Sequence, residues 1–146
     1  MKTAVALLAI YGASFAAAPA SPSSVPAELL GANWEWTGFR SPTERFTVAA
    51  PSRFRLTFVR DGSIAVHAAC NEGGSVAHFA HFGPSGGLSF GHGDLAMTDV
   101  ACSDGLLAFR FMKALLRSSS YVRRGRNLDL ELPRNSGIMH FRAENR

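Results

Sequence analysis

The sequence predicts a mainly β domain with one α-helix, built as a small antiparallel meander barrel with the helix packed at one end. Three observations favour this fold class. Short runs of alternating apolar and polar residues recur along the chain, and such runs are typical of strands with one buried face. Turn sequences rich in glycine and proline separate these runs, and only one segment has the apolar spacing of a helix. Closing the sheet into a barrel would leave no exposed strand edge.

The first twenty residues have the pattern of a signal peptide. Lys2 supplies a short positive end, residues 3–17 are mostly small or apolar, and Ala18-Pro19-Ala20 fits a cleavage site. We expect cleavage after Ala20 and an exported mature protein, either periplasmic or secreted. The alternative is a retained membrane helix, but about 15 residues at 1.5 Å each cover roughly 22 Å of a hydrocarbon core of about 30 Å. The mature chain offers no other candidate for a membrane span.

Cleavage would leave 126 of the 146 residues, enough for one domain and too few for two. Residues 21–28 begin with a stretch rich in serine and proline and are expected to form a flexible lead-in, and residues 29–146 the single domain. Without Lys2 the chain has 14 basic and 11 acidic side chains, a net charge of only +3. The densest basic stretch, Arg123 to Arg126, is expected at a solvated hairpin tip. Binding to a phosphate backbone usually needs a larger contiguous basic surface, and no nucleic-acid motif accompanies this stretch, so we expect no nucleic-acid partner.

The N-terminal strands are predicted from alternating bulky residues. Trp34 and Trp36 share one parity and predict a strand with both indoles on one face. A second, short strand is expected around Phe46 to Val48. Two further strands follow, with these residues on one face: Phe54, Leu56 and Phe58, then Ile64, Val66, Ala68 and Cys70.

The turn between these last two strands decides their register. A three-residue loop around Asp61 pairs Phe58 with Ile64 and keeps both apolar sets on one face, whereas a two-residue loop would split them. Gly62 then takes the third loop position, which requires a left-handed backbone. The same alternation predicts that Cys70 points inward.

A glycine-rich section and one helix complete the middle of the chain. Gly73-Gly74 and Gly83 to Gly87 are expected to separate short strands at 76–82 and 88–90, the second stretch as a hairpin turn. Ser103 or Asp104 is expected to be the N-cap residue of the helix. Its expected apolar face consists of Leu106, Leu107, Phe109, Phe111, Met112, Leu115 and Leu116, with Arg110, Lys113 and Arg117 opposite or near the C-terminal end.

The C-terminal part of the chain is predicted to be β structure. Leu128, Leu130 and Leu132 alternate within residues 121–132, which are expected to form a hairpin through Gly125. A turn and a last strand at 138–141 follow.

The two cysteines are the first candidates for chemistry. In an exported chain, a disulfide or a spatially adjacent pair is favoured for Cys70 and Cys102, and a bridge would close a loop of about 33 residues. The alternatives are two buried free thiols or a catalytic thiol, but no sequence pattern supplies the base that a nucleophilic cysteine needs.

The other polar residues do not indicate an enzyme. The five histidines are His67, His78, His81, His92 and His140. The pair at 78 and 81 would point to opposite faces of a strand and could share a metal ion only if the strand bends. A mixed site of one histidine with Cys70 or Cys102 is the other, less common alternative. No nucleophile elbow, zinc-protease motif, phosphate loop or dinucleotide fingerprint is present. We therefore expect no catalytic residues, no metal and no cofactor.

Four motifs in order resemble the META/HslJ-like domain family, whose pattern is L-x-G-x-W, L-x-F-x-x-D-G, G-C-N and T-x-x-A-C. The corresponding segments are Leu30 to Trp34, Leu56 to Gly62, Ala69 to Asn71 and Thr98 to Cys102, and the resemblance extends from Leu30 to Arg142. Two departures lie beside the first cysteine. Ala69 stands where the family has glycine, and Glu72-Gly73-Gly74 replaces the aromatic residue that usually follows the C-N pair.

The resemblance implies a small barrel with one helix, an envelope location, an association with heat-shock or antibiotic stress, and no known catalysis. The family motif residues are expected to be structural: Gly31, Trp34, Asp61, Gly62, Asn71 and Thr98. Short polar side chains such as Asn71 and Thr98 can tie loop backbone groups by hydrogen bonds. Contact with a ligand is the alternative role for these two.

Two functional hypotheses follow from these observations. The first is an exported, non-enzymatic protein of envelope stress tolerance, with the cysteine pair bracing the barrel. The second is a barrel-type binding module for a small apolar ligand or an envelope protein partner. An open cavity lined by Trp34, Trp36, Phe54 and Phe58 would favour the small ligand. A cysteine- or metal-dependent enzyme is the third and least supported reading.

Overall fold

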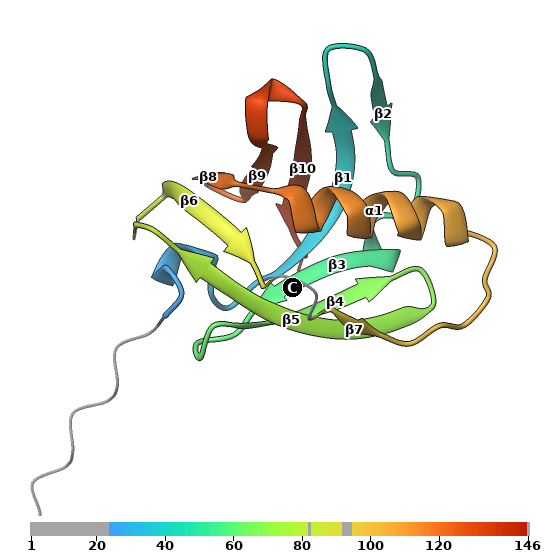
Figure 1. The fold of residues 1–146 in the computed structure, drawn as a ribbon, viewed down its shortest axis with the longest axis horizontal. Coiled ribbons are helices and arrows are strands. Elements are labelled where there is room, and N and C mark those ends of the chain that lie inside the picture. The colour runs from blue at the N-terminus through green and yellow to red at the C-terminus, as the bar shows by residue number, and fades with distance from the viewer. Residues whose placement is uncertain (1–23, 82, 92–94, 146) are drawn as a thin grey trace, which may run out of the picture.

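The computed structural model describes residues 24–81, 83–91 and 95–145, so the predicted signal peptide lies outside the described residues. Figure 1 shows a strongly curved sheet with one helix lying across it. The strands among these residues are β1 (Asn33–Arg40), β2 (Arg45–Thr47), β3 (Phe54–Phe58), β4 (Ser63–Ala68), β5 (Asn71–Phe79), β6 (Ser85–Phe90), β7 (Ala96–Met97), β8 (Ser120–Arg124), β9 (Asn127–Leu132) and β10 (Gly137–Ala143). The helix is α1 (Gly105–Arg117), and three short 3-10 turns cover Ala27–Leu29, Pro51–Arg53 and Pro133–Asn135.

Eight strands form a closed antiparallel barrel, and the predicted fold class is confirmed. Each strand of the barrel pairs with the next in the order β1, β3, β4, β5, β6, β8, β9 and β10. The barrel closes where β10 pairs with β1, for example Trp34 opposite Ala143 and Arg40 opposite Ile138. The extra strands β2 and β7 pair with β1 and β5.

The predicted register of the β3–β4 hairpin is confirmed. Phe58 lies opposite Ile64 and Leu56 opposite Val66, so both apolar sets face the barrel interior. Gly62 has a φ of 96°, the left-handed conformation that the three-residue loop requires. The hairpin through Gly125 is present as well, as β8 and β9.

The glycine pair between the cysteines lies within a strand, which corrects the expected separation. Gly73 and Gly74 belong to β5, which begins at Asn71. A Cβ on Gly73 would collide with the carbonyl oxygen of Ala96 in β7, and one on Gly74 would lie 2.7 Å from the carbonyl oxygen of Ile64 in β4. The pair therefore allows two neighbouring strands to approach β5 closely. The next hairpin turn is also shorter than expected, because β6 already begins at Ser85.

The chain packs against the barrel earlier than the sequence predicts. Val25 is 1% exposed, and the backbone N–H of Ser24 donates to the carbonyl oxygen of Arg60 at 3.2 Å. The 3-10 turn at Ala27–Leu29 then buries Leu29 completely. The expected flexible lead-in at 21–28 therefore does not extend over residues 24–28, because two apolar side chains anchor this segment in the core.

The helix fills one end of the barrel. Phe111 and Leu115 are fully buried, and the Phe111 ring centroid lies 5.1 Å from that of Trp36 and 5.8 Å from that of Phe54. Both tryptophans are buried on one face, as predicted. Burying a side chain such as Phe111 contributes roughly 1.5–3 kcal/mol to folding, so this aromatic cluster fixes the helix to the strands.

The helix differs from its prediction in the face that it buries. The buried side chains are Ala108, Phe111 and Leu115, whereas Leu106, Phe109 and Leu116 of the predicted apolar face are exposed. The stripe that contacts the barrel is narrower than the apolar composition suggests, because the barrel end accommodates only one side of a helix.

Among the described residues, no helix combines the length and apolar character needed to cross a bilayer.

Candidate functional site

The two cysteines form a disulfide that joins the β4–β5 turn to the loop before α1. The Cα atoms of Cys70 and Cys102 lie 6.2 Å apart, which is a usual spacing for a bridge. The predicted pair is thus confirmed, but the inward orientation of Cys70 is wrong. Ala69 takes a left-handed backbone conformation and ends the alternation of β4, so Cys70 lies in the turn and is only half-buried.

Asn71 and Thr98 connect the same two loops through side-chain hydrogen bonds. Oδ1 of Asn71 accepts from the backbone N–H of Val100 at 2.7 Å and from the Thr98 hydroxyl at 3.0 Å. The Asn71 amide donates to the carbonyl oxygen of Val100 at 3.0 Å. Thr98 Oγ1 also accepts from the backbone N–H of Glu72 at 3.0 Å. Hydrogen bonds from these side chains to loop backbone groups are what we expect if Asn71 and Thr98 have a structural role. We call Cys70, Asn71, Thr98, Val100 and Cys102 the disulfide corner.

Ala69 departs from the family glycine at a position where the backbone is left-handed. Its φ is 61°, and its side chain is buried. Such a conformation costs an L-residue roughly 1–2 kcal/mol, whereas glycine adopts it freely. The left-handed backbone therefore explains why the family has glycine at this position. This chain forms the same turn with an alanine in a strained conformation.

The remaining motif residues lie outside the disulfide corner and have local roles. Gly31 has a φ of 75° before β1, and the indole N–H of Trp34 donates to the carbonyl oxygen of Leu29 at 3.1 Å. Asp61 accepts hydrogen bonds from the hydroxyl and the backbone N–H of Ser63, at 2.6 and 2.8 Å. These bonds lower the pKa of the Asp61 carboxyl, because they favour its charged form.

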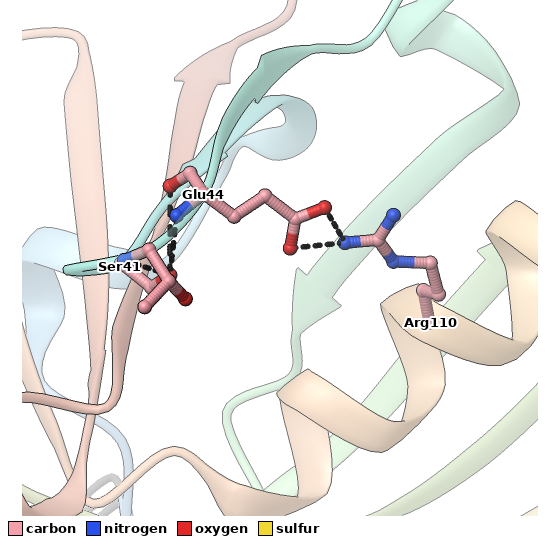
Figure 2. Close-up of polar contacts among 4 residues, drawn as sticks. Ser41, Glu44 and Arg110 are labelled. Carbon is pink, nitrogen blue, oxygen red and sulfur yellow. Dashed lines mark hydrogen bonds and ion pairs between the residues drawn. The ribbon is translucent and has the colours of Figure 1, made fainter.

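The β1–β2 hairpin is tied to α1 by an ion pair that sequence reasoning did not identify. The Arg110 guanidinium donates to both carboxylate oxygens of Glu44 at 2.6 Å, as Figure 2 shows. It also lies over the Phe46 ring at 4.5 Å from the centroid. Ser41 holds the turn, because its hydroxyl accepts from the backbone N–H of Glu44 at 3.1 Å. No local sequence pattern could have predicted this pair, because Glu44 and Arg110 are 66 residues apart and meet only in the folded protein.

A second ion pair lies at the N-terminal end of α1. Asp104 is the N-cap residue, one of the two predicted, but its side chain makes no capping hydrogen bond. Its carboxylate pairs with Arg53 instead. Glu44 and Asp104 are thus each paired with an arginine.

The outer side of α1 is apolar and cationic. Leu106, Phe109 and Leu116 are 78%, 63% and 41% exposed. With Lys113, they follow the spacing of three and four residues that places side chains on one helix face. Arg117 lies beside them in the last turn of the helix. We call these five residues the outer face of α1.

The barrel interior is filled with side chains. Trp34, Trp36, Phe54 and Phe58, which were predicted to line a cavity if the barrel held a ligand, are each at most 2% exposed. The largest cavity that we describe has a volume of about 570 Å³ and lies at the end of the barrel, between the β1–β2 and β9–β10 hairpins that project in Figure 1. Arg40, Ser41, Glu131 and Arg134 are among its lining residues. The interior therefore lacks the open space that the small-ligand hypothesis needs.

Two of the described histidines, His140 and His67, each lie beside a single carboxylate. Nδ1 of His140 lies 2.7 Å from a carboxylate oxygen of Asp129, and Nδ1 of His67 lies 3.3 Å from one of Glu72. In the described part of the chain there is no group of three or more histidines, cysteines or acids that could hold a metal ion. His92 lies outside that part.

Comparison with known proteins agrees with the motifs. A solved structure of a DUF4847 family protein from Bacteroides vulgatus ATCC 8482 superposes with a TM-score of 0.62, covering 81% of this chain and 96% of that chain at 12% identity. At this identity the similarity concerns the fold alone. None of the curated proteins gives a significant match. Residues 27–145 match the META domain. The chain therefore belongs to the META domain family.

Proposed function

We propose that this protein is exported and acts, without catalysis, in the tolerance of envelope stress such as heat and envelope-active antibiotics. The observation that carries the proposal is the Cys70–Cys102 disulfide. Disulfides persist in oxidising compartments and are rare in the cytosol, so a bridge between two loops of the domain supports folding after export. The resemblance to HslJ-like domains supports the stress role.

The use of the polar motif residues supports a non-enzymatic role. Asn71 and Thr98 bond to groups of the loop opposite their own, and Asp61 bonds to Ser63 of its own turn. None of the three lines the cavity between the β1–β2 and β9–β10 hairpins. A catalytic side chain has to reach a substrate in a positioned site. These residues are already occupied in holding the disulfide corner and the β3–β4 turn.

Deletion of the gene in its native host tests this proposal. We expect the deletion strain to grow less well than its parent at high temperature and with envelope-active antibiotics, and the full-length gene to restore growth. A gene without residues 1–20 should fail to restore growth, because its product stays in the cytosol. Cell fractionation gives the location of each product. Equal growth of deletion strain and parent would remove the stress role, and a cytosolic full-length product would remove export.

A second candidate function is a binding module that contacts its partner at the surface. The filled interior disfavours a ligand inside the barrel, whereas the outer face of α1 is a free apolar surface. Pull-down from the native envelope, with wild type and a Phe109→Ser variant, would show whether a partner depends on this face.

A further inference from the structure

The outer face of α1 combines large apolar side chains with cations and contains no acid. Residues 105–117 include Arg110, Lys113 and Arg117 and neither aspartate nor glutamate. Leu106 and Phe109 are more than half exposed, although a leucine and a phenylalanine together offer a large apolar area to water. A helix face of this composition requires an explanation beyond packing, since the opposite side of α1 already supplies the core contacts.

The cations of this face are not neutralised by the protein itself. Glu44 is bonded to Arg110, and Asp104 is paired with Arg53. In the described segments, neither Lys113 nor Arg117 has an acidic side chain within ion-pair distance. The face therefore presents two uncompensated positive charges among three exposed apolar side chains, and an occupant of complementary charge must be anionic.

We infer that the outer face of α1 binds the surface of an anionic lipid bilayer. Phenylalanine and leucine side chains can enter the boundary between headgroups and acyl chains, while lysine and arginine contact lipid phosphates. This inference rests on the proposed export, which would place the protein beside the membranes of the envelope. The contact is peripheral and needs no spanning helix.

The shape of the surface favours lipid over a protein partner. The cavity between the β1–β2 and β9–β10 hairpins is lined by residues outside α1, whereas Leu106, Phe109 and Leu116 of this face are exposed to solvent. Stable protein interfaces bury about 800 Å² on each partner and need close shape complementarity. A few protruding apolar and cationic side chains on one helix suffice for a fluid bilayer, which adapts its shape to them.

Vesicle flotation of the oxidised chain starting at Ser21 tests the inference. We expect binding to vesicles of phosphatidylglycerol mixed with phosphatidylcholine, weaker binding as salt is raised, and little binding to phosphatidylcholine alone. Lys113→Glu should weaken binding at least about fivefold, since each cation near an anionic surface contributes about that factor. Phe109→Ser should weaken it about tenfold through the loss of buried apolar area.

Matched controls carry the same chemical changes elsewhere on the surface. Arg45→Glu reverses an exposed charge on β2, and Val76→Ser removes an exposed apolar side chain from β5. We expect each control to bind better than its matched α1 variant. Circular dichroism and thermal unfolding verify that all four variants fold as the wild type does.

Three results would overturn the inference. One is equal binding to both vesicle types, and another is binding that Lys113→Glu and Phe109→Ser leave unchanged. The third is no vesicle binding together with capture of an acidic envelope protein that the same two variants lose, which would assign the face to a protein. None of these results bears on the growth of the deletion strain, so the proposed stress role would stand or fall separately.

Discussion

At the scale of single residues, Ala69 shows how one side chain can strain a turn. Its left-handed backbone, with a φ of 61°, precedes the disulfide cysteine. We expect Ala69→Gly to raise the free energy of unfolding by about 0.5–1 kcal/mol, because the relief of strain exceeds the added flexibility of the unfolded chain. Denaturant titration of the oxidised protein measures this. The control is Ala65→Gly in β4, which should destabilise, and an Ala69→Gly protein no more stable than wild type would contradict the strain.

A substitution at Asn71 can distinguish a structural role from a ligand-contact role, because only the structural role predicts a loss of stability without a ligand. Asn71→Ala leaves the backbone N–H and carbonyl of Val100 without their side-chain partner, so we expect a loss of about 1–2 kcal/mol in unfolding free energy without any ligand present. The same titration with Asn127→Ala, at an exposed position of β9, should give a much smaller loss. If Asn71→Ala unfolds like the wild type, the structural role is wrong.

Tyr121 gives the protein a predicted sensitivity to alkaline pH. The ring is buried in the barrel, its hydroxyl donates to the carbonyl oxygen of Gly83 at 2.8 Å, and burial raises its pKa above 10.0. The neutral form is therefore favoured in the folded state, and this contribution to stability is complete below pH 10 and is lost as the pH rises through the folded pKa. Tyr121 is the only tyrosine after residue 20, so absorbance titration of the chain from Ser21 reads it alone. Tyr121→Phe should lose less stability than wild type above pH 10, and parallel pH profiles would contradict the assignment.

At the scale of elements, the β1–β2 hairpin depends on α1 for its position. Arg110 joins them by its bonds to Glu44 and its contact with the Phe46 ring. Both charged side chains are more than a third exposed, so a double-mutant cycle with Glu44→Gln and Arg110→Ala should give a coupling of about 0.3–1 kcal/mol that weakens with salt. Arg110→Ala should cost more than Glu44→Gln, because it also removes the cation–π contact. A coupling of zero at low salt would show that the ion pair does not hold the hairpin.

The two sides of α1 have separate roles, one in packing against the barrel and one at the surface. Phe111 and Leu115 fix α1 to the barrel from one side, so substitutions at Phe109 or Leu106 on the other side should leave the fold intact. This separation is what allows the outer face to be tested for binding without unfolding the protein.

At the scale of the whole molecule, the disulfide is expected to supply a large part of the stability. It closes 32 residues of sequence separation across the part of the barrel that contains β5, β6 and β7. Constraining a loop of this length in the unfolded chain contributes roughly 3–4 kcal/mol. The Cys70→Ser/Cys102→Ser protein should therefore unfold at much lower denaturant, and reduced wild type should behave like it. Equal stability of the oxidised and reduced forms would contradict this.

Local patterns in the sequence predicted those parts of the fold that depend on neighbouring residues. The alternation of Phe54 to Ala68 predicted the register of the β3–β4 hairpin, because a slip by one residue would expose one complete apolar set. The cysteine pair also followed, since two cysteines allow only one intramolecular bridge. The order of the motifs predicted the family, which the match over residues 27–145 confirms.

Interactions between distant segments were beyond reach of such patterns. Apolar spacing alone did not distinguish Phe111, which enters the barrel, from Phe109, which faces water. The glycines of β5 were interpreted as a turn from the local sequence. Glycine is required there because β7 and β4 approach β5 closely, and this approach arises only in the folded sheet. The ion pair of Glu44 with Arg110 likewise links residues that no local rule connects.

The sequence by itself thus determined the fold class, the β3–β4 register, the cysteine pair and the family, because each depends on residue type, alternation and turn chemistry within short stretches. Only the tertiary structure decided that the barrel closes between β1 and β10, that its interior is filled, and that three large apolar side chains of α1 remain outside. The physical reason is that closure pairs residues such as Trp34 and Ala143, more than a hundred positions apart. Which helix face is buried is then fixed by the space left inside that closed barrel.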